Sequence, residues 1–131
     1  MSDLTILGDN LLPVPLGKKE LHRLAMNIVG KDLEKDNYEF LSINSSLEKN
    51  PQFVCIKNKQ LYFIIVKAIL YPENPKTFEI KNLNKILEHC NKFEAKLLCS
   101  KVGLANSDDY ELPLFKNSSY IINYEGIEQI N

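Results

Sequence analysis

The run Leu61–Leu70, LYFIIVKAIL, constrains the fold more than any other segment, because Lys67 is its only charged residue. The run is too short to cross a membrane as a helix, and no stretch approaches the 18 apolar residues that a membrane helix needs. Its aromatic and β-branched residues favour a strand. A strand that is apolar on both faces must be covered on both faces, so the run predicts the central strand of a sheet.

Two segments show the helical repeat of apolar residues. One spans about Lys18–Val29, and Gly30 follows it as a stop signal, but the helix extends one more turn if Leu33 packs. The other spans about Phe78–Lys92, with Thr77 as its expected N-cap. Each repeat places one apolar stripe on a helix, so both helices need the sheet to bury it. The stripes consist of Leu21, Leu24, Ala25, Ile28 and Val29 in the first helix and of Leu83, Ile86, Leu87 and Cys90 in the second.

Alternating apolar residues predict strands at 38–43, 52–57, 95–100 and 120–124, which gives the order α-β-β-β-α-β-β. A helix that joins two apolar strands favours a parallel pair, and the short turn after the second strand favours a hairpin. We therefore expect an α/β fold with a mixed central sheet flanked by two helices. The 131 residues suit a single domain. Its expected parts are an extended arm (1–16), an α/β core (18–124) with an acidic loop at 104–118, and a short tail (125–131).

Composition restricts the class of protein. Apolar residues make up 44% and charged residues 25% of the chain, which is typical of a globular domain. Residues 1–10 lack the basic and apolar regions of a signal peptide, and the cysteine count of three is odd. Together these features predict a cytoplasmic protein without a membrane segment, in which each thiol is a buried small hydrophobe. Three cysteines are too few for a ferredoxin-type cluster, and no glycine-rich phosphate loop is present, so no cofactor is predicted.

Charge is distributed unevenly along the chain. The net charge is −1, but residues 51–101 contain nine basic and four acidic side chains. This basic middle could form a weak phosphate-facing patch, or its lysines could be the solvated faces of strands and a helix. His22 and His89 both fall on predicted helices, and we expect them at the surface or the boundary rather than as catalytic bases.

The segment between Asn50 and Lys67 contains Pro51-Gln52 before one predicted strand and Ile65-Val66-Lys67 on the next. With the predicted element order, residues 18–101 resemble the PD-(D/E)XK nuclease superfamily, which has the restriction-endonuclease-like fold. That family has Pro-Asp at the first place and Asp/Glu-x-Lys at the second. The resemblance implies Mg²⁺ held by the two acids and a lysine that positions or activates water. Here Lys67 is retained, whereas Gln52 and Ile65 replace the acids.

Other acids could in principle replace the lost ones. Glu20, in the first predicted helix, could correspond to an extra acid found in parts of the family, and Glu73 or Glu79 could supply a migrated acid. We expect instead a remnant site formed by Lys67, Gln52 and Glu20, with no metal and no catalytic residue. A carboxylate lost from a Mg²⁺ site removes a full charge that glutamine and isoleucine do not restore.

The leading hypothesis is therefore a catalytically inactive, nuclease-like scaffold that acts through contacts with a protein partner or through self-association as a homo-oligomer. The alternative is a metal-dependent nuclease, or a nucleic-acid-binding relic of one, which the basic middle would support. Aromatic residues that could form a contact surface, if they are not part of the core, are Tyr62, Phe63, Tyr71 and Tyr120.

Overall fold

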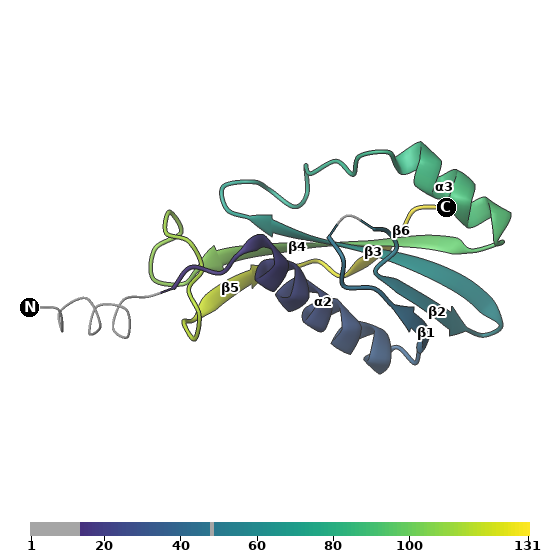
Figure 1. Cartoon of the computed structure of the whole chain (residues 1–131), viewed down its shortest axis with the longest axis horizontal. Helices are drawn as coiled ribbons and strands as arrows, with labels where there is room; N and C mark the ends of the chain where they lie inside the picture. Colours follow the sequence, from purple (N-terminus) through teal and green to yellow (C-terminus); the bar gives the residue numbers. More distant parts are fainter. Residues whose placement is uncertain (1–13, 48) are drawn as a thin grey trace, which may run out of the picture.

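The computed structural model describes residues 14–47 and 49–131. They form a single α/β domain with two helices and a mixed six-stranded sheet (Figure 1). The predicted order α-β-β-β-α-β-β is confirmed, and one further short strand follows it. The elements are α2 (Lys18–Lys35), β1 (Glu39–Ile43), β2 (Phe53–Lys57), β3 (Gln60–Leu70), α3 (Leu83–Lys92), β4 (Lys96–Asn106), β5 (Tyr120–Asn123) and β6 (Ile127–Gln129).

The sheet has the strand order β1-β2-β3-β4-β5, and β6 also pairs with β4. The apolar run forms β3 and lies at the centre, as predicted. β3 and β4 are parallel and all other pairs are antiparallel. The β3–β4 ladder extends to Leu70 paired with Leu104, whereas β2 pairs with β3 only over Gln60–Ile64. Beyond that point β3 has no strand beside it on the β2 side among the described residues.

The two helices lie on opposite sides of the sheet (Figure 1). Successive residues of β3 point to opposite faces. Ile64 and Val66 pack in the core under α2, and Phe63 and Ile65 pack in the core under α3. The prediction that β3 is covered on both faces is therefore confirmed.

α2 is longer than predicted. It passes Gly30 and ends at Lys35, because Leu33 is fully buried and the sheet stabilises one more turn. A Cβ at Gly30 would meet the Phe53 ring at an ordinary 3.6 Å, so this glycine is not required as a stop.

α3 is shorter than predicted, and Thr77 is not its N-cap. The helix begins at Leu83 after Asn82, which has a left-handed φ of 59°. The Thr77 hydroxyl donates to the Asn74 carbonyl instead, within a turn. This turn belongs to the 71–82 connection, where Pro75 is buried against β4 near Gly103.

Both ends of the described chain pack on the domain. The predicted tail, 125–131, is part of the sheet: β6 pairs with residues 98–100 of β4, and the Ile130 N–H donates to the Leu97 carbonyl at 2.8 Å. Gly126, at φ 99°, turns the chain between β5 and β6. Most of the predicted arm lies outside the described residues. Its last part packs as an edge, since the Leu16 N–H donates to the Leu114 carbonyl at 2.8 Å.

Candidate functional site

Gln52, at the first position of the nuclease-like motif, is a structural residue. Its side chain is fully buried, and its Oε1 accepts a 2.8 Å hydrogen bond from the Val66 N–H. Its Nε2 donates to the Lys49 carbonyl at 2.9 Å and to Asn50 Oδ1 at 3.0 Å. The amide thus ties the β1–β2 connection to β3, at the place where the β2–β3 ladder ends. The Gln52 amide oxygen is therefore engaged in the sheet rather than presented to a metal ion.

The two residues at the second motif position, Ile65 and Lys67, differ in burial. Ile65 is fully buried under α3, so a metal-ligating carboxylate at this position would disrupt the core. Lys67 is half-buried, and burial lowers the pKa of its ammonium. It lies just beyond the part of β3 that β2 covers.

The acids considered as replacements do not form a metal site. Glu20 closes the start of α2: its Oε1 accepts from the Gly17 N–H at 3.3 Å, and its Oε2 lies 3.6 Å from Lys116 Nζ. Glu73 is near Lys67, and Glu79 is exposed. Among residues 14–47 and 49–131, no group of three or more His, Cys, Asp or Glu side chains could hold a metal ion.

Lys67 opens onto a cavity of about 470 Å³ that we call the edge pocket. α2, the β1–β2 connection and the end of β3 meet there, at the strand edge that β2 leaves open. Of the predicted remnant site, Lys67 lines this pocket, whereas Gln52 and Glu20 do not. The lining residues are Lys18, Leu21, His22, Leu47, Lys67, Ala68, Leu70, Tyr71, Pro72 and Glu73.

His22 is the residue of this pocket that sequence reasoning missed. It was expected at the surface or boundary, but it is only 3% exposed, so that prediction is wrong. Its Nε2 is buried and has no hydrogen-bond partner among the described residues. Burial, and then the charge of Lys67, lower the pKa of His22, which keeps the ring neutral near pH 7. Its spacing from Ala25 and Met26, both buried, places it on the inner stripe of α2 and was the available signal.

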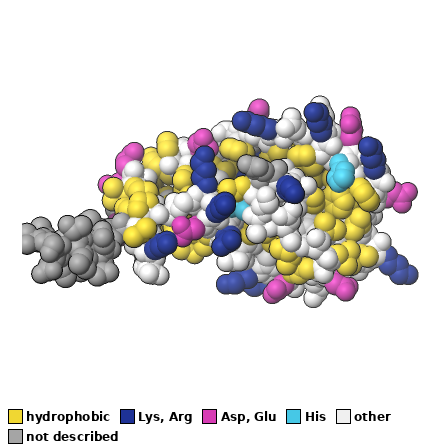
Figure 2. Space-filling view, in the orientation of Figure 1, with side chains coloured by type: hydrophobic (Ala, Val, Ile, Leu, Met, Phe, Trp, Pro, Cys, Tyr) yellow, Lys and Arg dark blue, Asp and Glu magenta, His cyan; other side chains and the backbone are white. Residues whose placement is uncertain are grey.

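A second hollow of about 450 Å³ lies beside the same connection and is lined by Lys19, Arg23 and residues 44–47. Leu47 lines both hollows, so four cations border them: Lys18, Lys19, Arg23 and Lys67. Figure 2 shows Lys and Arg side chains gathered in the middle of the visible face, where Figure 1 places the first turns of α2. Three of these four come from α2, and only Lys67 belongs to the basic middle of the sequence.

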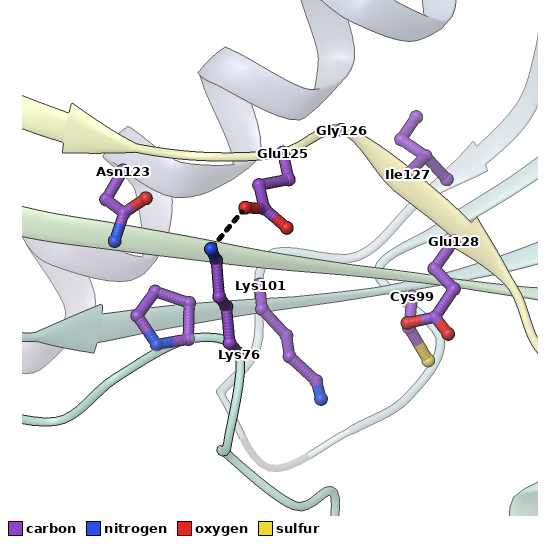
Figure 3. Close-up of a pocket in the computed structure, with 9 residues that line it drawn as sticks. Lys76, Cys99, Lys101, Asn123, Glu125, Gly126, Ile127 and Glu128 are labelled. Carbon is purple, nitrogen blue, oxygen red and sulfur yellow. Dashed lines mark ion pairs between the residues drawn. The ribbon is translucent and has the colours of Figure 1, made fainter.

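A third hollow, also about 470 Å³, lies between β4 and the β5–β6 strands (Figure 3). Its charges are largely satisfied: Lys76 pairs with Glu125 at 3.0 Å, and Lys101 donates to the Phe78 carbonyl. Burial raises the pKa of Cys99 to about 11, so this thiol stays protonated at neutral pH. The three described cysteines are all free and buried, which confirms the prediction for them.

Apolar side chains are exposed at the far end of the sheet. Tyr71 and Tyr110 contact edge to face, 5.4 Å between ring centroids, beside Ile121 in a hollow of about 370 Å³. Figure 2 shows hydrophobic side chains at the left, where Figure 1 places β5 and the loop before it. Of the predicted contact residues, Tyr71 and Tyr120 are exposed, whereas Phe63 is core and Tyr62 packs against the α2 core.

Residues 19–130 match the sequence model of a domain family of unknown function, DUF8840. The chain belongs to the DUF8840 family. No curated protein sequence matches it. The DUF8840 match extends from α2 to β6 and includes every residue of the edge pocket except Lys18. No described helix is long and apolar enough to cross a membrane.

Proposed function

We propose that this DUF8840 protein is a non-catalytic domain on a nuclease-like scaffold and that it acts by self-association. The observation that carries the proposal is the open edge of β5. All four residues of β5 are exposed, including Ile121 and Ile122, and β5 pairs only with β4 among the described strands. The run from Asn117 to Tyr124 contains no charged residue.

Edge strands are normally protected against pairing with another chain by charges, bulges or proline. β1, at the opposite edge, has such protection: it begins with Glu39 and contains a register shift between Phe40 and Ser42. β5 has neither a charge nor a bulge in its four-residue ladder with β4. The unprotected edge favours β5 as the associating strand.

A second copy of the same chain is the occupant that suits this edge. In a two-fold dimer, antiparallel β5 strands would face each other, and their uncharged side chains would create no like-charge repulsion. The pairing would also bring together the exposed apolar side chains Tyr120, Ile121 and Ile122 of both copies. Burial of this surface is the expected driving force.

Loss of catalysis is supported by the motif positions. Gln52 uses its amide to hold Val66 and the β1–β2 connection, and Ile65 is part of the core. Titration of Mg²⁺ or Mn²⁺ should therefore give no saturable rise in the thermal midpoint, because a metal that binds the native state would raise it. A rise of several degrees at millimolar metal would contradict the non-catalytic part of the proposal.

Sedimentation velocity over a range of concentrations tests self-association. The wild-type chain is expected to be a dimer, and Ile122→Lys is expected to be a monomer, because it places a charge from each copy at the shared edge. The matched control is Ile43→Lys on β1, where Ile43 is 62% exposed, and it should remain a dimer. A monomeric wild-type chain at all concentrations would refute the proposal, and a monomeric control would move the interface to β1.

A nucleic-acid-binding relic is the second candidate, and the four cations around the two adjoining hollows favour it. Binding through phosphate contacts weakens steeply as salt rises. Fluorescence anisotropy with a labelled oligonucleotide at several salt concentrations separates the two candidates. Affinity that falls with salt, and falls again in Arg23→Gln, would favour the relic.

A further inference from the structure

The edge pocket contains a feature that distinguishes it from the other hollows. A buried polar nitrogen without a partner is costly to maintain, and His22 Nε2 is the one such side-chain atom found among the described residues. His22 lines the pocket together with Lys67. In the hollow of Figure 3, by contrast, the lysines have partners: Lys76 pairs with Glu125 and Lys101 with a carbonyl.

The lining of the edge pocket is mostly apolar, and its charged side chains are two lysines and one glutamate. Lys67 is half-buried and makes no ion pair with a described acid, and Lys18 adds a second ammonium at the rim. N–H and C=O groups alternate in direction along a strand. Val66 donates to Gln52 on the β2 side, so the Ala68 backbone also points to that side, where β2 no longer runs. The acidic residue of the lining, Glu73, is exposed.

We propose that the edge pocket binds a small oxyanion, a phosphate or carboxylate group, held by His22 Nε2 and the open edge of β3 at Ala68, with the ammonium groups of Lys18 and Lys67 at its rim. The neutral imidazole donates its Nε2–H to one oxygen, and Lys67 balances the negative charge. The Ala68 N–H is in position to donate to a second oxygen at the open strand edge. Because Nε2 is covered in the described structure, a side chain of the pocket wall must turn aside to admit the ligand. This inference does not rest on self-association.

Side-chain NMR of ¹⁵N-labelled protein during titration with inorganic phosphate tests the proposal directly. Saturable shifts of the His22 ring nitrogens are expected. Lys67→Gln should weaken phosphate binding roughly tenfold, the usual contribution of one charge-assisted hydrogen bond. The matched control is Lys85→Gln on α3, which makes the same charge change at an exposed position away from the pocket and should leave the affinity unchanged.

His22→Phe separates binding from folding. Phenylalanine fills a similar space without the unpartnered nitrogen, so the thermal midpoint should stay the same or rise while phosphate binding is lost. If the histidine is purely structural, His22→Phe would lower the midpoint and leave phosphate binding intact, which would overturn the proposal. If His22→Phe does not fold, the Lys67→Gln and Lys85→Gln pair still decides the question.

Two further titrations identify the source of the oxyanion. Acetate distinguishes a carboxylate site from a phosphate site, and a short single-stranded oligonucleotide distinguishes a backbone phosphate from a free one. Shifts of His22 with any of the three, together with sensitivity to Lys67→Gln, support the proposal and name the source. No shift with any of them, or equal weakening by Lys67→Gln and Lys85→Gln, refutes it.

Discussion

In the covered half of the sheet, where β2 pairs with β3 and both helices pack on it, buried polar groups have partners. Gln52 makes three hydrogen bonds there and Ile65 is sealed in the core. The far end begins at Lys67, where β3 and β4 continue beyond β2 and finally meet β5. There His22 Nε2 has no hydrogen-bond partner among the described residues, Lys67 lines a cavity, and isoleucines of β5 are exposed.

The two regions also differ at the positions that the resemblance to the PD-(D/E)XK superfamily singles out. The two positions at which that family has acids fall in the covered half, where a carboxylate would be costly and where Gln52 and Ile65 stabilise the sheet. The lysine position is the first residue of the far end, where contact with solvent and a cavity lowers the free-energy cost of a charged side chain. Groups that are free to bind a ligand are therefore concentrated at the far end, and the difference between the two regions can be measured.

The largest expected effect concerns the thiols of the covered half at high pH. Burial raises the pKa of both Cys55 and Cys99 from 9.0 to about 11. Between pH 9 and 11 the unfolded chain has lost thiol protons that the folded chain still holds, so the free energy of unfolding falls as pH rises. Each thiol contributes roughly 2 to 3 kcal/mol to this fall, and the full stability is present below pH 9.

Urea unfolding at pH 8 and pH 10.5 measures this effect. Other groups titrate in the same range, among them Tyr124, whose pKa burial raises to about 12. The Cys55→Ala, Cys99→Ala double variant isolates the share of the thiols, and its stability should depend less on pH. Equal pH dependence in the variant and the wild type would show that the thiols of the covered half are not sealed from water.

The next effect in size concerns Gln52. In Gln52→Ala the buried Val66 N–H loses its acceptor and a small cavity forms, so the free energy of unfolding should fall by about 3 kcal/mol. Gln60→Ala is the matched control, because Gln60 donates to two carbonyls at the β2–β3 turn, and it should cost under about 1 kcal/mol. Equal losses of unfolding free energy in the two variants would mean that the hydrogen bonds of Gln52 between the β1–β2 connection and β3 contribute no more than those of Gln60.

The smallest effect compares two glycines, one in each region. At Gly103, in the far end, an added Cβ would lie 2.6 Å from Pro75 Cγ and 2.9 Å from the Asn123 oxygen. Gly103→Ala should therefore destabilise by roughly 1 to 3 kcal/mol, because buried Pro75 has to move. Gly30→Ala, in the interior of α2, meets only the Phe53 ring at 3.6 Å and should stabilise by about 0.5 to 1 kcal/mol.

Thermal unfolding measures both variants: the midpoint should fall in Gly103→Ala and rise in Gly30→Ala. A neutral Gly103→Ala would show that the 71–82 connection moves freely away from β4. A destabilising Gly30→Ala would show that α2 and β2 are packed more tightly than the structure describes.

Periodicity alone predicted most of the elements but not all of their ends. The apolar run fixed β3 as the central strand, and the repeat of leucines and isoleucines fixed both helices. The end of α2 depended on whether Leu33 packs on the sheet, which spacing alone did not decide. The length of β4 was missed because β3 runs beside it to Leu104. β6 was missed because three residues carry little pattern until a neighbouring strand pairs with them.

The site was predicted only in part for a similar reason. Motif spacing singled out Lys67 and Gln52, and the structure gives the first a cavity and the second a core position. Glu20 was singled out too, but it binds the Gly17 N–H and faces Lys116. His22 was missed because a polar residue next to a helical stripe is usually exposed.

By itself, the sequence determined the α/β class, the element order and the burial of its thiols, because these depend on local spacing and on the hydrophobic effect. Only the tertiary structure decided which polar groups are satisfied. The Val66 N–H donates a hydrogen bond to Gln52 where the β2–β3 ladder ends, whereas His22 Nε2 has no partner among the described residues. Such pairings depend on where strands end relative to one another, and a single chain's spacing does not record that.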